Sequence, residues 1–199
     1  MQGVSWETYE ALLRDLGDDG PRMAYDRGLL EIMSPSKKHE KFKKLVARLI
    51  EAYTEELGID IGSTGSTTFK LRMKERGLEP DESYYVQNES RVRAKDDIDL
   101  QVDPPPDVAI EIDLRQSPLD KLGIHAALKI PEVWSHDGKH IVIHLLQASG
   151  EFVDGKRSRA FPDLPLRELE RFLDRVGSES ETQVIRAFRQ WLRERSGGR

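Results

Sequence analysis

The sequence predicts a single α/β domain, α+β in detail, in which helices flank a central mixed β-sheet. Three observations favour this fold class. Amphipathic helical segments stand near both ends of the chain, and short strand-like runs separated by Gly and Pro occupy its middle. With 199 residues, of which 37% are hydrophobic, the chain can bury one ordinary core. We divide the expected domain, residues 1–199, into an N-terminal helix and hairpin (1–33), a core (34–146) and a C-terminal helical extension (147–199).

The first third of the chain carries two predicted helices with a hairpin between them. Residues 5–16 have apolar side chains at helical spacing. Two strand-like runs, 22–25 and 29–33, flank an Asp-Arg-Gly turn and predict the hairpin. The second helix is expected between Ser36, a typical N-cap residue, and Gly58, a typical terminator. Its first half carries five lysines that we interpret as a solvated face: Lys37, Lys38, Lys41, Lys43 and Lys44.

The sheet is expected mainly in the middle of the chain. Residues 59–65 and 67–73 are strand-like, and Gly77 marks a predicted turn. A further strand is expected at 81–86, and a long polar loop at 87–103. The later elements are a buried strand (108–112), a helix (118–128) with Ser117 as its N-cap, a hairpin turning at Asp137-Gly138 (132–134 and 139–146), an edge strand (151–153) and two helices (166–176 and 181–195).

Composition limits the partners that the chain can have. The formal net charge is −5, so the whole molecule does not attract nucleic acid, and such binding would need a local basic patch or metal ions. Cysteine is absent, no apolar run approaches the roughly 20 residues of a membrane span, and the amino terminus lacks the features of a signal peptide. We therefore expect a cytoplasmic protein that does not enter a membrane.

Two acidic residues on separate predicted strands are the strongest candidates for chemistry. Glu111 lies within Val-Ala-Ile-Glu-Ile, where an unpaired charge would be unfavourable in a buried strand. Asp81 begins an earlier strand, so pairing of the two strands would bring both carboxylates together, and Lys121 on the next helix can reach the same place. Such oxygen ligands suit Mg²⁺ or Mn²⁺, although carboxylates near strand ends are usually solvated. Asp107 is a rival to Asp81, because it lies four residues before Glu111 and shares its strand face.

Several blocks of the sequence resemble a bacterial family of putative restriction endonucleases, common in cyanobacteria, within the PD-(D/E)XK nuclease superfamily. The resemblance implies a restriction-endonuclease-like core in which Asp81 and Glu111 bind the metal. The superfamily pattern has lysine two residues after the second acid, where this chain has Asp113; Lys121 matches the position from which relatives supply that lysine. The blocks are Met33-Ser-Pro-Ser36, Glu79-Pro-Asp-Glu-Ser-Tyr-Tyr-Val86, Pro105-Pro-Asp-Val-Ala-Ile-Glu-Ile112, Ser117-Pro-Leu-Asp-Lys121 and Ile130-Pro-Glu-Val-Trp134.

The same resemblance completes the expected site and its function. It adds Glu40, because the first core helix of the superfamily often carries a third carboxylate, and His39 lies beside it. The Ile112 carbonyl is a further candidate metal ligand. The implied function is a Mg²⁺-dependent endonuclease that hydrolyses DNA, with Lys121 orienting the attacking water or stabilising the transition state, and a homodimer suits the cutting of both strands. The alternative is a non-catalytic binding or assembly module that keeps the nuclease fold, since a fold does not fix a function.

Overall fold

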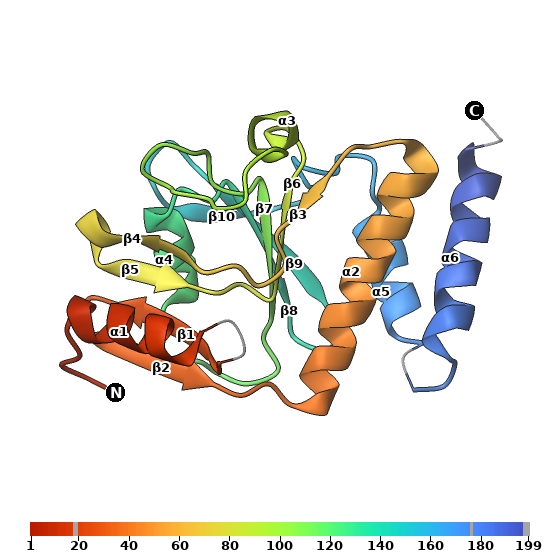
Figure 1. The fold of residues 1–199 in the computed structure, drawn as a ribbon. Coiled ribbons are helices and arrows are strands. Elements are labelled where there is room, and N and C mark those ends of the chain that lie inside the picture. The colour runs from red at the N-terminus through yellow and green to blue at the C-terminus, as the bar shows by residue number, and fades with distance from the viewer. Residues whose placement is uncertain (18–19, 176, 197–199) are drawn as a thin grey trace.

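A six-stranded mixed β-sheet forms the centre of the molecule, and helices cover it on both faces (Figure 1). The structure is a computed structural model that describes residues 1–17, 20–175 and 177–196. β7 and β8 pair in parallel, whereas the other neighbouring strands pair antiparallel. The predicted fold class is therefore confirmed. In order across the sheet, the strands are β10 (Phe152–Gly155), β9 (Ile141–Leu146), β8 (Glu132–His136), β7 (Val108–Ile112), β6 (Glu82–Tyr85) and β3 (Gly62–Ser63).

The central strand β7 is buried along its whole length, and its two faces carry different side chains. Val108, Ile110 and Ile112 belong to the larger hydrophobic core, whereas Ala109 belongs to a second core on the opposite face. Glu111 shares the face of Ala109, because side chains alternate along a strand. The larger core also contains residues of three helices, α2 (Lys37–Leu57), α5 (Leu166–Leu173) and α6 (Glu181–Ser196).

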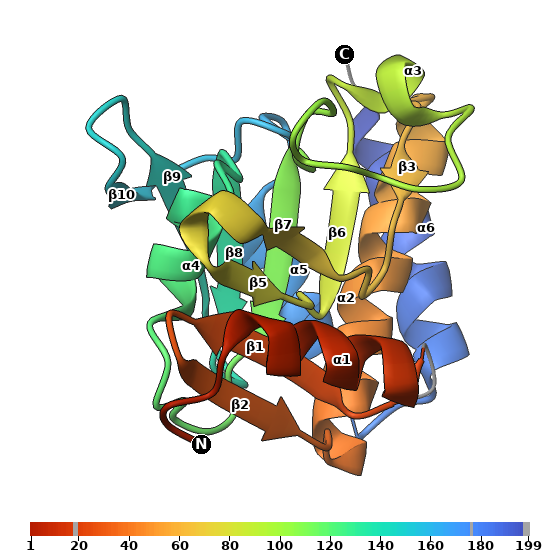
Figure 2. The ribbon, with the colours of Figure 1, turned by 60° about the vertical axis from the view of Figure 1, so that its left-hand side comes forward.

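A second, four-stranded antiparallel sheet crosses the face of the central sheet that carries Glu111 (Figure 2). Its core with the central sheet joins Ala24, Phe69 and Leu78 to Ala109 and to the helix α4 (Lys121–Ala127). The strand order is β2 (Leu29–Met33), β1 (Arg22–Asp26), β5 (Arg76–Leu78) and β4 (Phe69–Leu71).

The helix α1 (Trp6–Leu16) covers the far side of this second sheet (Figure 2). Trp6 and Tyr9 pack on Tyr25 of β1, with ring centroids 5.5 and 4.9 Å from that of Tyr25. The N-cap of α1 is Ser5, whose hydroxyl accepts a hydrogen bond from the Thr8 amide at 3.1 Å. This aromatic layer fixes β1, the strand that begins with Arg22, relative to the rest of the chain.

Several local predictions differ from the structure. Gly77 does not form a turn but lies within β5, and the turn falls earlier, at the 3₁₀ helix η1 (Arg72–Lys74). A side chain at Gly77 would meet Tyr9, since an added Cβ would lie 2.6 Å from the Tyr9 hydroxyl. The helix predicted from residue 118 begins at Lys121 with Asp120 as its N-cap, while the Ser117 hydroxyl accepts from the Leu119 amide and donates to Glu31. The predicted loop 87–103 contains one helical turn, α3 (Glu89–Val92).

The strands connect the three expected parts of the chain. The N-terminal hairpin shares its sheet with β4 and β5, because β1 pairs with β5. The β9–β10 hairpin spans the expected boundary after residue 146. The predicted helix 166–176 ends at Leu173 as α5, and Val176 lies outside the described residues. Among the helices that the structure describes, none has the length and apolar character needed to cross a membrane.

Candidate active site

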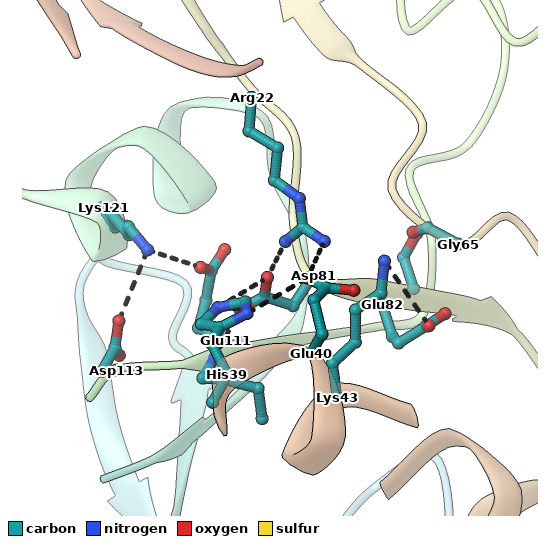
Figure 3. A network of polar contacts seen from close by, with 12 residues as sticks. Arg22, His39, Glu40, Lys43, Gly65, Asp81, Glu82, Glu111, Asp113 and Lys121 are labelled. Carbon is teal, nitrogen blue, oxygen red and sulfur yellow. Dashed lines mark hydrogen bonds and ion pairs between the residues drawn. The ribbon is translucent and has the colours of Figure 1, made fainter. Parts of the chain in front are cut away.

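Asp81 and Glu111 meet across neighbouring strands, as the sequence predicts (Figure 3). The antiparallel register pairs Glu82 of β6 with Ile110 of β7, which places Asp81 opposite Glu111. The Asp81 amide donates to the Ile110 carbonyl at 3.0 Å. Both carboxylates are almost fully buried, with 1% of Asp81 and 3% of Glu111 exposed. Burying two acids side by side requires cationic partners for each of them.

The partners of Glu111 come from α4, the helix that follows its strand. The Lys121 ammonium donates to Glu111 Oε2 at 2.8 Å and lies 3.4 Å from Asp113 Oδ1. His125, one helical turn after Lys121, places Nε2 2.9 Å from Glu111 Oε1. Burial disfavours the charge of Glu111, but Lys121 and His125 outweigh it and hold the pKa of Glu111 below its usual range. Glu111 is therefore ionised at neutral pH.

The Lys121 side chain bears a permanent positive charge. Burial lowers the pKa of Lys121, but the neighbouring Glu111 and Asp113 carboxylates have the larger combined effect and raise the pKa above its usual value. Lys121, the first residue of α4, thus contacts Glu111 as predicted, whereas its second carboxylate partner is Asp113 and not Asp81.

The partners of Asp81 come from three other parts of the chain. Asp81 Oδ2 accepts from the Ile112 amide at 2.6 Å. The Nε2 of His39 lies 3.1 Å from the Asp81 carboxylate. The Arg22 guanidinium, from the first residue of β1, forms an ion pair with Asp81 Oδ1. Asp81 is thus bound by groups from β7, α2 and the second sheet.

Glu40 lies at the edge of the same network. Ser36 caps α2 by accepting from the His39 amide at 3.2 Å, which sets His39 and Glu40 in the first turn. Glu40 Oε1 lies 3.3 Å from Arg22 Nη2 and 3.3 Å from His39 Nδ1, and 41% of its side chain is exposed. Burial lowers the pKa of His39, and Arg22 lowers it further, so the imidazole is neutral at pH 7.

One turn along α2, a buried ion pair extends the network. Lys43 and Glu82 lie 3.9 Å apart and are 8% and 6% exposed. Burial lowers the pKa of Lys43 and raises that of Glu82. The prediction that all five lysines of α2 are solvated is therefore wrong for Lys43, because it points under the helix toward β6 rather than outward (Figure 3).

Asp107, the rival of Asp81, is placed elsewhere. Its carboxylate accepts from the amides of Val86 and Asn88 at 2.7 and 2.9 Å and from the Asn88 side chain at 2.7 Å. These bonds hold the turn after β6. Asp107 consequently organises the chain at the opposite end of β7 from Ile112, and it makes no contact with Glu111 among the described residues.

Open space adjoins the charged network. A pocket of about 200 Å³ is lined by His39, by the turn before α2, by residues 112–117 and by Lys121. A smaller cavity of about 20 Å³ lies between Arg22, Glu31 and Glu111. A third, shallower hollow lies beside residues 113–117, and Lys121 lines all three spaces. Its ammonium thus stands where the buried carboxylates meet the accessible surface.

The donor set suits a hard divalent cation. Asp81, Glu111 and the half-exposed Glu40 are oxygen donors, and Mg²⁺ usually takes one or two protein carboxylates and keeps several waters. Within residues 1–17, 20–175 and 177–196, no group of three or more His, Cys, Asp or Glu side chains is arranged to hold a metal ion. The carboxylates of Asp81 and Glu111 are the two buried oxygen donors that could hold such an ion.

Sequence patterns did not identify Arg22, His125 or the Lys43–Glu82 pair. His125 had one usable signal, because it stands four residues after Lys121 and so lies on the same side of a helix. Arg22 had none, since its hairpin carries no motif and the contact with Asp81 spans 59 positions of the chain. Lys43 had no separate signal either, because four other lysines stand near it in the sequence.

The mixed sheet with helices on both faces places the chain in the class of nuclease-like folds. A solved structure described as a putative nuclease belonging to DUF820 from Anabaena variabilis is similar to this chain, with a TM-score of 0.57. It covers 85% of this chain and 99% of its own, at 16% identity. Residues 6–174 match the model of the Uma2 family, described as "putative restriction endonuclease", and the chain belongs to that family. A search of curated proteins found no match.

Proposed function

We propose that this protein is a metal-dependent endonuclease that hydrolyses phosphodiester bonds in DNA. One observation carries the proposal: the buried carboxylates of Asp81 and Glu111 stand opposite each other, and Lys121 joins the second of them to an open pocket. Membership of a family of putative restriction endonucleases supports the same class of activity. DNA as substrate agrees with the expected cytoplasmic location.

Asp81 and Glu111 would hold Mg²⁺ or Mn²⁺, with the Ile112 carbonyl and Glu40 as further ligands. When bound there, the ion supplies positive charge that acidifies a nearby water and neutralises the phosphoryl oxygens. His125 and the Ile112 amide fix the orientation of the two carboxylates. The two carboxylates are therefore positioned before substrate binds, which reduces reorganisation during the reaction.

Lys121 acts in this proposal as a fixed cation. Because its pKa is raised, the ammonium does not give up its proton at neutral pH and does not serve as a general base. Its position at the pocket suits it to orient the attacking water and to stabilise charge on the phosphoryl group. Three lysines of α2 are exposed, Lys37, Lys38 and Lys44, and they are suited to bind phosphates of the same DNA.

The test is cleavage of supercoiled plasmid, linear duplex and branched DNA with Mg²⁺ or Mn²⁺. Glu111→Gln and Lys121→Met are expected to lower the rate by about 100-fold or more. Glu151→Gln and Lys156→Met, which change exposed side chains that line none of these pockets, are matched controls that retain the parent rate. Circular dichroism and thermal melting verify that the variants fold. Site variants as active as the parent would refute this mechanism.

The second candidate is a non-catalytic module that keeps the nuclease fold. It is favoured by the saturation of both acids: every carboxylate oxygen of Asp81 and Glu111 contacts a cationic, imidazole or amide group of the chain itself. Such a network stabilises a fold without any metal. Absence of cleavage on all three DNA forms, together with no Mn²⁺-induced rise in melting temperature, would favour this module.

We also propose a homodimer for the nuclease, because one site in each chain cuts one strand of a duplex. Sedimentation or light scattering at micromolar concentration measures the mass. A monomer that cuts both strands in one encounter would contradict this assembly.

A further inference from the structure

Arg22 stands closest to the carboxylate that the proposed function assigns to the metal. Its guanidinium forms an ion pair with Asp81 Oδ1 and lies 3.3 Å from Glu40 Oε1. Figure 3 shows it entering the network from the second sheet, on the side opposite the α2 helix. Only 12% of the Arg22 side chain is exposed. A positive charge is thus inserted between two of the three acids of the candidate site.

The contacts of Asp81 make Oδ1 the oxygen at which an additional cation would bind. Oδ2 accepts the short hydrogen bond from the Ile112 amide, which belongs to β7 and is fixed by the sheet. The Arg22 guanidinium contacts Oδ1, and the neutral His39 imidazole places Nε2 3.1 Å from the same carboxylate. A divalent cation bound at Oδ1 and the Arg22 guanidinium would repel each other strongly, because both would be buried and little water would screen their charges.

We propose that Arg22 and the divalent cation compete for Asp81, and that Arg22, once released from Asp81, binds a phosphate of the DNA substrate. This inference rests on the proposed function. The backbone of Arg22 is fixed by pairing with Met33, so only the flexible side chain needs to move. Arg22 lines the small cavity that Glu111 and Lys121 also line, and Lys121 connects this cavity to the pocket of about 200 Å³. Once its side chain has moved toward that pocket, the guanidinium can bind a phosphate through two parallel hydrogen bonds.

The proposal predicts effects of opposite sign on metal binding and on catalysis. In Arg22→Gln, the competing charge is gone, so calorimetry should show Mn²⁺ binding tighter than in the parent by a factor on the order of 10 or more. At saturating Mn²⁺, the same variant should cleave DNA about 10-fold or more slowly, because the phosphate contact is lost. Arg22→Lys retains the charge and should keep the parent Mn²⁺ affinity within about 3-fold.

Arg76→Gln is the matched control. Arg76 also comes from the second sheet and is largely buried, but it pairs with Asp26 at 2.8 Å and with the Gly123 carbonyl at 3.0 Å, away from Asp81. It should lose stability without any change in Mn²⁺ affinity. Thermal melting of each variant separates misfolding from the effect on the site, and Arg22→Met, which also removes the charge, serves if Arg22→Gln does not fold.

The outcomes separate this proposal from the proposed function. Parent protein that binds Mn²⁺ and cleaves DNA, with Arg22→Gln binding Mn²⁺ equally or more weakly, overturns the competition alone. An undiminished rate for Arg22→Gln at saturating Mn²⁺ overturns the phosphate contact. Absence of Mn²⁺ binding in the parent and in Arg22→Gln overturns both the competition and the metal-dependent mechanism.

Discussion

His136 is a buried histidine outside the candidate site whose two ring nitrogens have no hydrogen-bond partner among the described residues. It ends β8, is 1% exposed, and packs against Phe42 with ring centroids 4.9 Å apart. Burial lowers the pKa of His136, and the opposing attractions of Asp137 and Glu170 do not compensate. The imidazole is therefore held neutral in the folded protein, with the unfavourable free energy of an unpaired buried polar group.

Replacing His136 with Leu should stabilise the fold and remove part of its acid sensitivity. An unpaired buried polar group costs about 1–3 kcal/mol, so we expect the free energy of unfolding to rise by about 1 kcal/mol at pH 7. Because the unfolded chain binds a proton at His136 more readily than the folded protein does, the free energy of unfolding is independent of this residue's titration above pH 6.5. It decreases as the pH falls from 6.5 through the lowered pKa of the folded state. Urea unfolding between pH 7.5 and 5 measures both effects.

His140→Gln is the control for this prediction, because His140 has a side chain that is 74% exposed. It should change the stability by less than about 0.5 kcal/mol at every pH. If His136→Leu retained the acid sensitivity of the parent, the buried imidazole would not be its source.

The residues of the candidate site differ in how far they could be predicted. Asp81, Glu111 and Lys121 could be predicted because each is tied to a local pattern: a strand end, a buried acidic position, and the start of the next helix. Arg22 and His125 bind the same carboxylates but were missed, since no local pattern shows which cation faces a buried acid. That choice depends on how the second sheet and α4 pack onto β7.

At the scale of elements, long segments with caps were predictable and very short strands were not. The helix α2 lies between its N-cap Ser36 and its C-cap Gly58, as predicted, and α1 (Trp6–Leu16) agrees with the predicted helical residues 5–16. By contrast, β4 and β5 have three residues each, too few to show a period of two. Their hydrogen-bonding partners are each other and β1, which lies about fifty positions earlier, so their pairing is set by tertiary structure.

Gly77→Ala tests why β5 contains a glycine. An added Cβ would lie 2.6 Å from the Tyr9 hydroxyl and 2.9 Å from Lys70 Cβ, so α1 and β4 would have to shift. Overpacking of this kind typically costs about 1–3 kcal/mol, and thermal melting should show the loss. Gly62→Ala in β3 is the matched control, because its Cβ would meet no atom closer than 3.6 Å. Equal stability of the two variants would argue against the close approach of Tyr9.

At the scale of the whole molecule, a cluster of ion pairs fastens α6 to the C-terminal end of α2. Glu56 accepts from Arg189 at 3.0 Å and from Arg193 at 2.7 and 2.8 Å, and Arg189 also pairs with Glu55. The hydrogen bonds from Arg193 and Arg189 lower the pKa of Glu56 to about 2. Glu56 lies 16 positions after Glu40 on the same helix, which corresponds to roughly 24 Å. The cluster and the candidate site therefore occupy opposite ends of α2.

This separation predicts that stability and activity can be changed independently. Because the pKa of Glu56 falls from 4.5 to about 2 on folding, its contribution to the free energy of unfolding is present above pH 4.5 and disappears as the pH drops toward 2. Glu56→Gln should melt below the parent at pH 7, and the difference should shrink between pH 4.5 and 2 and also in high salt. Its rate of DNA cleavage at 25 °C should equal that of the parent, whereas Glu151→Gln should change neither quantity. A difference in melting temperature that stayed constant across this pH range would exclude the ionised Glu56 as its cause. A slower rate of cleavage by Glu56→Gln would mean that loss of the ion pairs between α2 and α6 changes the position of His39 and Glu40 at the other end of α2.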